Sequence, residues 1–137
     1  MIISYIGLMG IMLAKVLKSI SDDDSLELFR SIALKDSDSE SLRRKTKMTR
    51  KQYYSRMSRL MKAGLTRRKN GKHTLTAFGK VIYDTQITIE NAINNYWKLK
   101  AIDSLEMSND LPAEERQKLI DNLIENNGIR EILAKKT

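Results

Sequence analysis

Several residue types are scarce in this chain, and each scarcity excludes a class of site. The 137 residues include no cysteine, which excludes disulfides, thiol redox sensing and thiolate metal ligands. His73 is the only histidine, so we predict no metal site and no cofactor. One proline and six glycines leave few residues that interrupt helices, and we therefore expect helix to dominate the fold.

Acidic residues are missing from one long stretch. Residues 41–80 hold fourteen lysines and arginines and no aspartate or glutamate, whereas the rest of the chain holds eleven basic and seventeen acidic residues. The net charge of +8 is therefore concentrated in one region of a basic protein. This arrangement is typical of proteins that bind phosphate backbones. The alternative, an ordinary solvated surface, normally mixes both signs.

The sequence also lacks the usual signatures of an active site. It has no nucleophile–base pair, no glycine-rich loop to cradle phosphates and no cluster of metal ligands. We therefore predict that the protein is not an enzyme.

The first fourteen residues, 1–14, carry no charged side chain. They are fewer than the ~20 apolar residues that span a bilayer, and they lack the basic region and cleavage site of a signal peptide. We favour a helix that packs on the body of the protein or on a second subunit. Association with a membrane surface and an extension ahead of a start at Met9 or Met12 are the alternatives. We otherwise expect a cytoplasmic protein without membrane association.

A helix with one apolar and one basic face is predicted between Thr49 and Gly64. Thr49 can cap its start, and Gly64 can end it in a left-handed conformation. The apolar residues recur at helical spacing on one stripe: Tyr53, Met57, Leu60 and Met61. The remaining surface carries mostly basic and hydroxyl side chains, which suits contact with a polyanion.

Two shorter helices precede this one. The first is predicted near 23–33, with acidic residues at its positive end and an apolar face of Leu26, Leu28, Phe29, Ile32 and Leu34. The second is predicted over 39–46, with Leu42 directed inward. Met48 fills the turn between this helix and the basic one. Two short helices joined by about three residues fit a helix-turn-helix.

A β-hairpin is predicted directly after Gly64. Residues 65–69 and 72–75 flank Asn70-Gly71, and both turn positions tolerate the positive φ that a two-residue hairpin requires. Lysines and arginines surround the tip. A hairpin with a cationic tip after a basic helix is the wing of a winged helix-turn-helix.

A long helix should follow Thr76, which can cap it. Its apolar residues alternate by four and three positions: Phe78, Ile82, Thr85, Ile89, Ala92, Tyr96 and Leu99. This seam is longer than a small winged domain can cover, so we expect its distal half to pack on a second subunit in a homodimer. The alternative is that the two ends of the same chain cover it.

The C-terminal part is predicted to be a helical tail. After a break at 107–110, Pro112 opens a helix with Leu119, Ile120, Leu123 and Ile124 on one face, closed by Asn126-Asn127-Gly128 and followed by a last helical segment from Ile129. We thus predict a mainly α fold in four parts: an apolar helical segment at 1–20, a winged helix-turn-helix domain at 21–82, a long and dimer-forming helix at 83–106, and a tail at 107–137.

At this point the pattern resembles a known family. Residues 48–75 are similar to the winged helix-turn-helix of the ArsR/MarR-like transcriptional regulators, through Met48-Thr49, the core triplet of Tyr53, Met57 and Leu60, the run Lys62-Ala63-Gly64-Leu65 and the charged hairpin. Residues 75–79, LTAFG, resemble the passage into the next helix, and RKQYYSRMSRLMKAGL resembles small archaeal regulators of this superfamily. The resemblance covers residues 22–82.

The resemblance implies that the first turns of the basic helix enter the DNA major groove. It makes Thr49, Arg50, Lys51, Tyr54 and Ser55 the contact positions. The chain departs from the family at Thr46, where an aliphatic residue is usual, and in the basic outer face of the helix at 39–46. The family's metal-sensing cysteines are absent, so no effector is implied.

We therefore predict a sequence-specific regulator that binds double-stranded DNA. The candidate contacts fall into three sets: Thr49, Arg50, Lys51, Gln52, Tyr54, Ser55 and Arg59 on the recognition helix; Arg43, Arg44, Lys45, Lys47 and Lys62 on the phosphate backbone; and Arg67, Arg68, Lys69, Asn70, Lys72 and His73 in the wing. Arg50 and Lys51 either read bases or contact only phosphates, and Tyr54 either meets DNA or packs on the preceding helix. The other functions are a non-specific architectural protein, an RNA-binding protein and a winged-helix module that binds an acidic protein.

Overall fold

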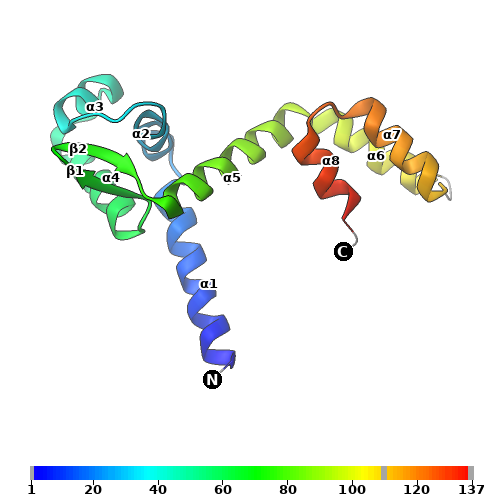
Figure 1. Ribbon diagram of the computed structural model, residues 1–137, viewed down its shortest axis with the longest axis horizontal. Coiled ribbons are helices and arrows are strands. Elements are labelled where there is room, and N and C mark those ends of the chain that lie inside the picture. The colour runs from blue at the N-terminus through cyan, green and yellow to red at the C-terminus, as the bar shows by residue number, and fades with distance from the viewer. Residues whose placement is uncertain (1, 109–110, 136–137) are drawn as a thin grey trace. The chain divides into compact units, whose positions relative to one another are not determined.

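The computed structural model describes residues 2–108 and 111–135. The chain divides into two compact units, Met1–Tyr83 and Asp84–Thr137, which are described separately below. In chain order the elements are α1 (Ile2–Ser19), α2 (Asp23–Leu34), α3 (Ser39–Thr46), α4 (Arg50–Lys62), β1 (Thr66–Lys69), β2 (Lys72–Leu75), α5 (Ala77–Asn94), α6 (Tyr96–Ser108), α7 (Ala113–Leu123) and α8 (Asn127–Ala134) (Figure 1). The predicted mainly helical fold with one hairpin is confirmed. Residues 109 and 110 of the predicted break lie outside the described residues.

The first unit contains the three predicted helices, α2, α3 and α4. Aspartates begin the first two, since the Asp22 carboxylate accepts from the Ser25 N–H at 2.9 Å and that of Asp38 accepts from the Ser41 N–H at 2.8 Å. Such N-caps satisfy backbone donors that a helix start leaves unpaired. The ends of α2 and α3 agree with the prediction to within one residue.

The core of the first unit lies between α2, α3, α4 and the start of the hairpin. Its buried residues include Leu28, Phe29, Ile32, Leu42, Met48, Tyr53, Met57, Leu60 and Leu65. Met48 therefore fills the turn between α3 and α4, as predicted. Two predicted core positions are wrong: Leu34 is 67% exposed and Met61 is 42% exposed. The helical repeat places Leu34 on the side of α2 opposite Leu28 and Ile32, and it places Met61 at the edge of the apolar stripe of α4.

The connection from α4 to the hairpin is a left-handed turn at Gly64, whose φ is 81°. The Gly64 N–H donates to the Met61 carbonyl and the Leu65 N–H to the Leu60 carbonyl, both at 3.0 Å. These two bonds satisfy the carbonyls at the end of α4 and carry the chain into β1. The hairpin turn has φ of 53° at Asn70 and 75° at Gly71, which is the primed turn predicted from Asn-Gly.

The start of α5 is fastened to the end of α4. Thr76 Oγ1 donates to the Gly64 carbonyl at 2.5 Å and accepts from the Gly79 N–H at 2.9 Å. Thr76 thus caps the helix, as predicted. At the end of the unit, Tyr83 packs edge-on against Phe29, with ring centroids 5.7 Å apart.

Helix α1 contacts the rest of the first unit chiefly near its C-terminal end, where Val16 and Ser19 are buried. Large apolar side chains elsewhere on the helix are exposed: Leu8, Met9, Met12, Leu13 and Leu17. The segment is therefore helical, as predicted, and only part of it is covered by its own unit (Figure 1). No described helix combines the length and apolarity needed to cross a bilayer.

The second unit contains most of α5 together with α6, α7 and α8. Its core is formed by Ile102, Ile120, Ile124 and Ile129. The helix predicted over 83–106 is in fact two helices, because a turn at Asn95 separates α5 from α6. Much of the predicted seam is exposed within this unit, including Ile89 at 54% and Tyr96 at 51%.

The tail differs from the prediction at one helix boundary. Asn126 caps α8, because its side-chain oxygen accepts from the Ile129 N–H at 3.0 Å. Asn127 and Gly128 therefore begin α8, where we had expected them to close the preceding helix. Helix α7 ends earlier, at Leu123.

Candidate nucleic-acid interface

The start of α4 is held by a reciprocal pair of capping bonds. Thr49 Oγ1 accepts from the Gln52 N–H at 3.2 Å, and Gln52 Oε1 accepts from the Thr49 N–H at 3.1 Å. This capping box fixes the first turn of the helix, which is the turn predicted to approach DNA. It also engages two predicted contact residues, so the side-chain oxygens of Thr49 and Gln52 are partly committed to the helix itself.

The two faces of α4 separate as the sequence pattern predicts. Tyr53, Met57 and Leu60 are buried. The opposite side is exposed and carries Arg50, Lys51, Tyr54, Ser55 and Lys62. The Tyr54 ring is 57% exposed and stacks edge-on against Tyr53, with centroids 5.2 Å apart. A tyrosine held this way offers its ring edge and hydroxyl to a partner outside the unit.

Two arginines of α4 are drawn toward α2 by its acidic cap. Arg56 Nε lies 3.2 Å from the Asp22 carboxylate, and one Arg59 guanidinium nitrogen lies 3.6 Å from the same carboxylate. Partial burial alone would raise the pKa of Asp22, but hydrogen bonds from Ser25 and Arg56 outweigh it and hold the pKa below 3.8. Arg59 therefore lies at the edge of the predicted DNA-binding surface, beside the Asp22 carboxylate. Because this carboxylate already attracts its guanidinium, Arg59 is a weaker candidate for a DNA contact than Arg50 or Lys51.

Helix α3 presents the predicted basic outer surface. Leu42 and Thr46 are buried, and Thr46 Oγ1 donates to the Leu42 carbonyl at 2.8 Å. Satisfied in this way, Thr46 can take the inward position where we noted that an aliphatic residue is usual. Arg43 is half-buried, whereas Arg44, Lys45 and Lys47 are exposed. Arg44 pairs with Glu40 at 3.2 Å, but an exposed pair of this kind contributes little and can be exchanged for a phosphate.

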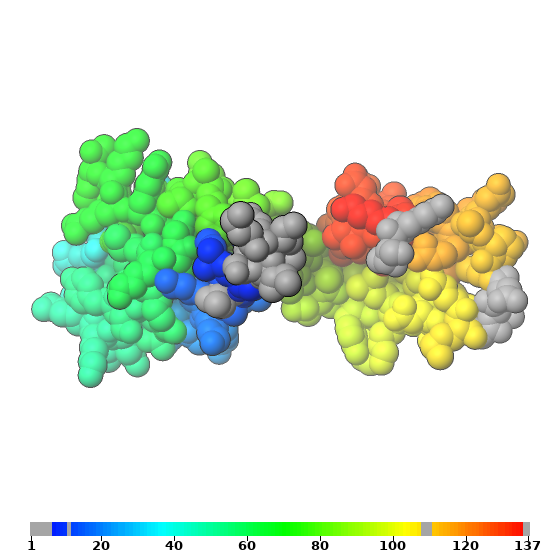
Figure 2. All heavy atoms as spheres, turned by 90° about the horizontal axis from the view of Figure 1, so that it is seen from below, coloured from blue at the N-terminus to red at the C-terminus, as the bar shows by residue number. Residues whose placement is uncertain are grey.

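A hollow of about 330 Å³ separates α3 from the start of α4. Its lining residues come from both helices: Ser39, Glu40, Arg43, Arg50, Tyr53 and Tyr54. Figure 2 shows the cyan and green residues of α3, α4 and the hairpin as a continuous stretch of surface.

The hairpin distributes its cations over two faces. In the strand register Arg68 lies opposite His73, Arg67 opposite Thr74, and Lys69 opposite Lys72. Because side chains alternate along a strand, Arg67 and Lys69 share one face and Arg68 lies on the other. All of these arginines and lysines are exposed, yet they do not form the single ring of charge that the sequence suggested.

His73 is the clearest correction to the predicted wing contacts. It is only 4% exposed, its Nε2 lies 2.9 Å from Ser39 Oγ, and its backbone N–H donates to the Ser37 carbonyl at 2.9 Å. Burial, and then the nearby charge of Arg68, lower the pKa of His73 below 6.5. The residue therefore joins the hairpin to the start of α3 and is not available to DNA. Sequence reasoning missed Ser37 and Ser39, because no local pattern links them to the hairpin.

We expect this histidine to make stability depend on pH. Since its pKa is lowered in the folded state, its contribution is complete above the unfolded value of 6.5 and is lost as the pH falls below it. Urea midpoints should decline between about pH 7.5 and pH 5.5. In the His73→Gln variant the urea midpoint should change less over this pH range. Parallel curves for parent and variant would show that His73 is not the source of the pH dependence. Asp22 and Asp38, whose pKa values are lowered from 3.8, titrate below this pH range.

Comparison with solved structures identifies the architecture. The homodimeric winged helix-turn-helix DNA-binding domain (fragment 1–100) of a possible ArsR-family transcriptional regulator from Mycobacterium bovis matches with a TM-score of 0.54 and 15% identity, over 64% of this chain and 86% of that one. An ArsR-like transcriptional regulator from Rhodococcus sp. RHA1 matches with a TM-score of 0.50 and 20% identity, over 75% of this chain and 98% of that one. No protein-family model and no curated protein matches the chain significantly.

These likenesses establish the fold class. The chain has a winged helix-turn-helix fold: α2, α3 and α4 form the three-helix core, and β1 and β2 form the hairpin wing. In the part of the chain that the structure describes, no three histidine, cysteine, aspartate or glutamate side chains are grouped so that they could hold a metal ion.

Proposed function

We propose that this protein is a transcriptional regulator that binds double-stranded DNA in a sequence-specific manner, with α4 in the major groove and the wing on the adjacent backbone or minor groove. One observation carries the proposal. The acid-free stretch of residues 41–80 comprises most of α3, all of α4 and the wing. All of its lysines and arginines therefore belong to the same folded unit. The fold shared with two proteins described as ArsR-like or ArsR-family regulators adds support.

Within this proposal the contacts divide into readers and clamps. Arg50 and Lys51 are exposed on the first turn of α4 and can donate to the major-groove edge of guanine. Tyr54 and Ser55 extend the same surface. The exposed lysines at 45, 47, 62 and 72 are better suited to phosphates, which position a protein without reading sequence. Arg44 and Arg59 would first have to leave Glu40 and Asp22.

Replacing Arg50 or Lys51 by alanine tests base reading. For at least one of the two, we expect affinity for a duplex selected from a random pool to fall by ~1–3 kcal/mol, with a smaller loss on unrelated duplex. Mobility shift or fluorescence anisotropy measures both. Lys118→Ala, at an exposed position of α7, is the matched charge control. Equal losses on all sequences would make these residues phosphate clamps and would favour an architectural DNA-binding protein.

We also propose that the protein acts as a homodimer. Large apolar side chains are exposed on α1, including Leu13 at 60%, and on the second unit, including Ile93 at 67% and Trp97 at 77%. Isolated soluble chains rarely expose so many, and a two-fold dimer would present two recognition helices to two half-sites. Sedimentation velocity of the purified protein tests the proposal, and a monomer at micromolar concentration would contradict it.

The archaeal character suggested by the sequence and a cytoplasmic location remain predictions.

A further inference from the structure

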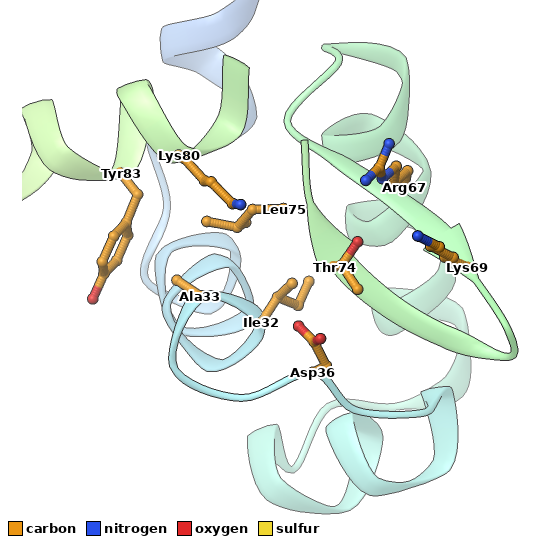
Figure 3. A pocket seen from close by; sticks show the side chains of 9 residues that line it. All are labelled: Ile32, Ala33, Asp36, Arg67, Lys69, Thr74, Leu75, Lys80 and Tyr83. Atoms are coloured by element: carbon orange, nitrogen blue, oxygen red, sulfur yellow. The ribbon is translucent and has the colours of Figure 1, made fainter. Parts of the chain in front are cut away.

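A cavity of about 380 Å³ lies behind the wing, between α2, the two strands and the first turns of α5 (Figure 3). It lies entirely within the first unit. Apolar atoms of Ile32, Leu75 and Tyr83 form part of its wall. The volume falls in the range of small-molecule sites, which run from about 300 to 1,000 Å³.

The charged residues around this cavity are mostly of one sign. Arg67 and Lys69 line it from β1 and Lys80 from α5, whereas Asp36 is the only acid among the described residues of its lining. In Figure 3 the Lys80 side chain reaches toward Leu75, and the Asp36 carboxylate is directed toward the strands. Arg67 and Lys69 share the strand face that is turned this way, as the alternation of β1 requires.

These three cations lack the partners that other basic residues of the unit have. Arg44, Arg56 and Arg59 each lie within 4.0 Å of a carboxylate, but within residues 2–108 and 111–135 none of the three cations at the cavity makes an ion pair. Like charges around a concave site repel one another and raise the local concentration of anions. The formal charge of the lining is +2, so a dianion would neutralise it.

We propose that this cavity binds a small phosphate monoester. Such a group carries about −1.5 to −2 charges near neutral pH, which matches the lining. The Arg67 guanidinium can bind a phosphate through two parallel hydrogen bonds, and Lys69 and Lys80 supply point charges. The organic part of the ester would rest on Tyr83 and Ile32.

The position of the cavity favours a small ligand over the DNA backbone. Lys80 and Tyr83 belong to α5, and Asp36 to the α2–α3 connection, outside the predicted DNA contacts. A backbone phosphodiester carries a single charge, half of what the lining can neutralise, and it has no free end that could turn its neutral side toward Asp36. A small ester can orient its phosphate toward the cations and its neutral part toward Asp36.

Binding at this site would also affect the wing, and this step rests on the proposed function. Arg67 and Lys69 belong to the predicted wing contacts. A ligand that engages both from behind the wing would withdraw two cations from the DNA backbone. The ester would therefore act as an effector that weakens DNA binding.

The site is tested with phenyl phosphate in the absence of DNA. Two-dimensional NMR at constant ionic strength should show saturable shifts at the amides of Ala33, Leu75 and Lys80, with weaker binding of inorganic phosphate. Lys80→Ala should lower phenyl phosphate affinity about tenfold, the loss expected for one charged hydrogen bond, and Asp36→Asn should raise it. Both positions are exposed, so the fold should survive.

Lys118→Ala is the control and should leave affinity unchanged. Equal effects of Lys80→Ala and Lys118→Ala, or no saturable shift at millimolar phenyl phosphate, would overturn the proposal. So would a short duplex that produces the same shifts at Ala33 and Lys80, because the cavity would then be a DNA-phosphate site.

A second experiment tests the ligand site and the proposed DNA binding independently of each other. Phenyl phosphate should release duplex DNA from the parent protein, and much less so from Lys80→Ala. Binding of phenyl phosphate by a protein that ignores DNA would refute the proposed function and leave the site intact. DNA binding that is indifferent to bound phenyl phosphate would refute the regulatory step.

Discussion

Replacing Gly79 by alanine is expected to destabilise the winged-helix unit by about 3 kcal/mol or more. A Cβ atom at this position would lie 1.9 Å from the Leu65 carbonyl oxygen and 2.9 Å from its carbon, far inside van der Waals contact. The obstacle is backbone, so no side chain can rotate away. Either α5 must move away from the hairpin or the chain at Leu65 must move into the core.

Neither movement is free of cost. Leu65 is fully buried, its N–H donates to the Leu60 carbonyl, and its carbonyl accepts from the Thr76 N–H, both at 3.0 Å. On the other side, the Gly79 N–H is held by Thr76 Oγ1 at 2.9 Å. Breaking one or two such bonds costs about 0.5–1.5 kcal/mol each, and displacing packed core residues adds about 1–3 kcal/mol.

Urea unfolding followed by circular dichroism measures the loss. Gly10→Ala is the matched control, because a Cβ at Gly10 in α1 would meet no atom within 4 Å. Alanine is the better helix former by about 1 kcal/mol, so this variant should be no less stable than the parent. A Gly79→Ala protein within about 1 kcal/mol of the parent would show that the α5–hairpin junction adjusts easily.

Features governed by a few adjacent residues could be predicted from the sequence. Thr49 was predicted to cap the start of α4, and it does so as one partner of a capping box with Gln52. Gly64 and Asn70-Gly71 are residues that tolerate positive φ, and all three have it. In each case the physical cause lies within one turn of chain, so the local pattern was sufficient.

Features that depend on distant residues were missed. His73 stands in a cationic strand and looks like another wing contact, but it is buried against Ser39, which is 34 positions away. The alternation of a strand shows that two faces exist, but it does not show which face another element covers. For the same reason the sequence could not reveal that the acids at the start of α2 would attract Arg56 and Arg59 of α4.

The break at Asn95 was missed although a local signal existed. The heptad pattern runs through it without interruption, and no proline or glycine marks it. The Asn95 side-chain NH₂ donates to the Asn91 carbonyl at 2.8 Å, and its backbone N–H lies 3.1 Å from both the Asn91 and the Ala92 carbonyls. Asparagine competes with helical backbone bonding in this way, so Asn94-Asn95 is the local signal for the interruption between α5 and α6.

Affinity for duplex DNA should fall by ~10³-fold or more between about 50 and 200 mM salt. Each phosphate neutralised by a lysine or arginine releases condensed counterions and contributes about −0.9 to the slope of log affinity against log salt. Six such contacts suffice for the expected loss. The exposed lysines at 45, 47, 62 and 72, together with Arg67 and Arg68 of the wing, make up that number without the base readers and without the ion-paired Arg44 and Arg59.

Anisotropy titrations over this salt range measure the slope, and single variants show which residues contribute to it. Lys62→Ala should reduce its magnitude by about one, whereas Arg59→Ala should change it less, because Arg59 already lies 3.6 Å from Asp22 and gains less from a phosphate. A flat salt response, or absence of binding at the lowest salt, would refute the DNA interface. An unchanged slope in Lys62→Ala alongside a reduced one in Arg59→Ala would instead show that the Arg59 guanidinium leaves Asp22 to contact a phosphate.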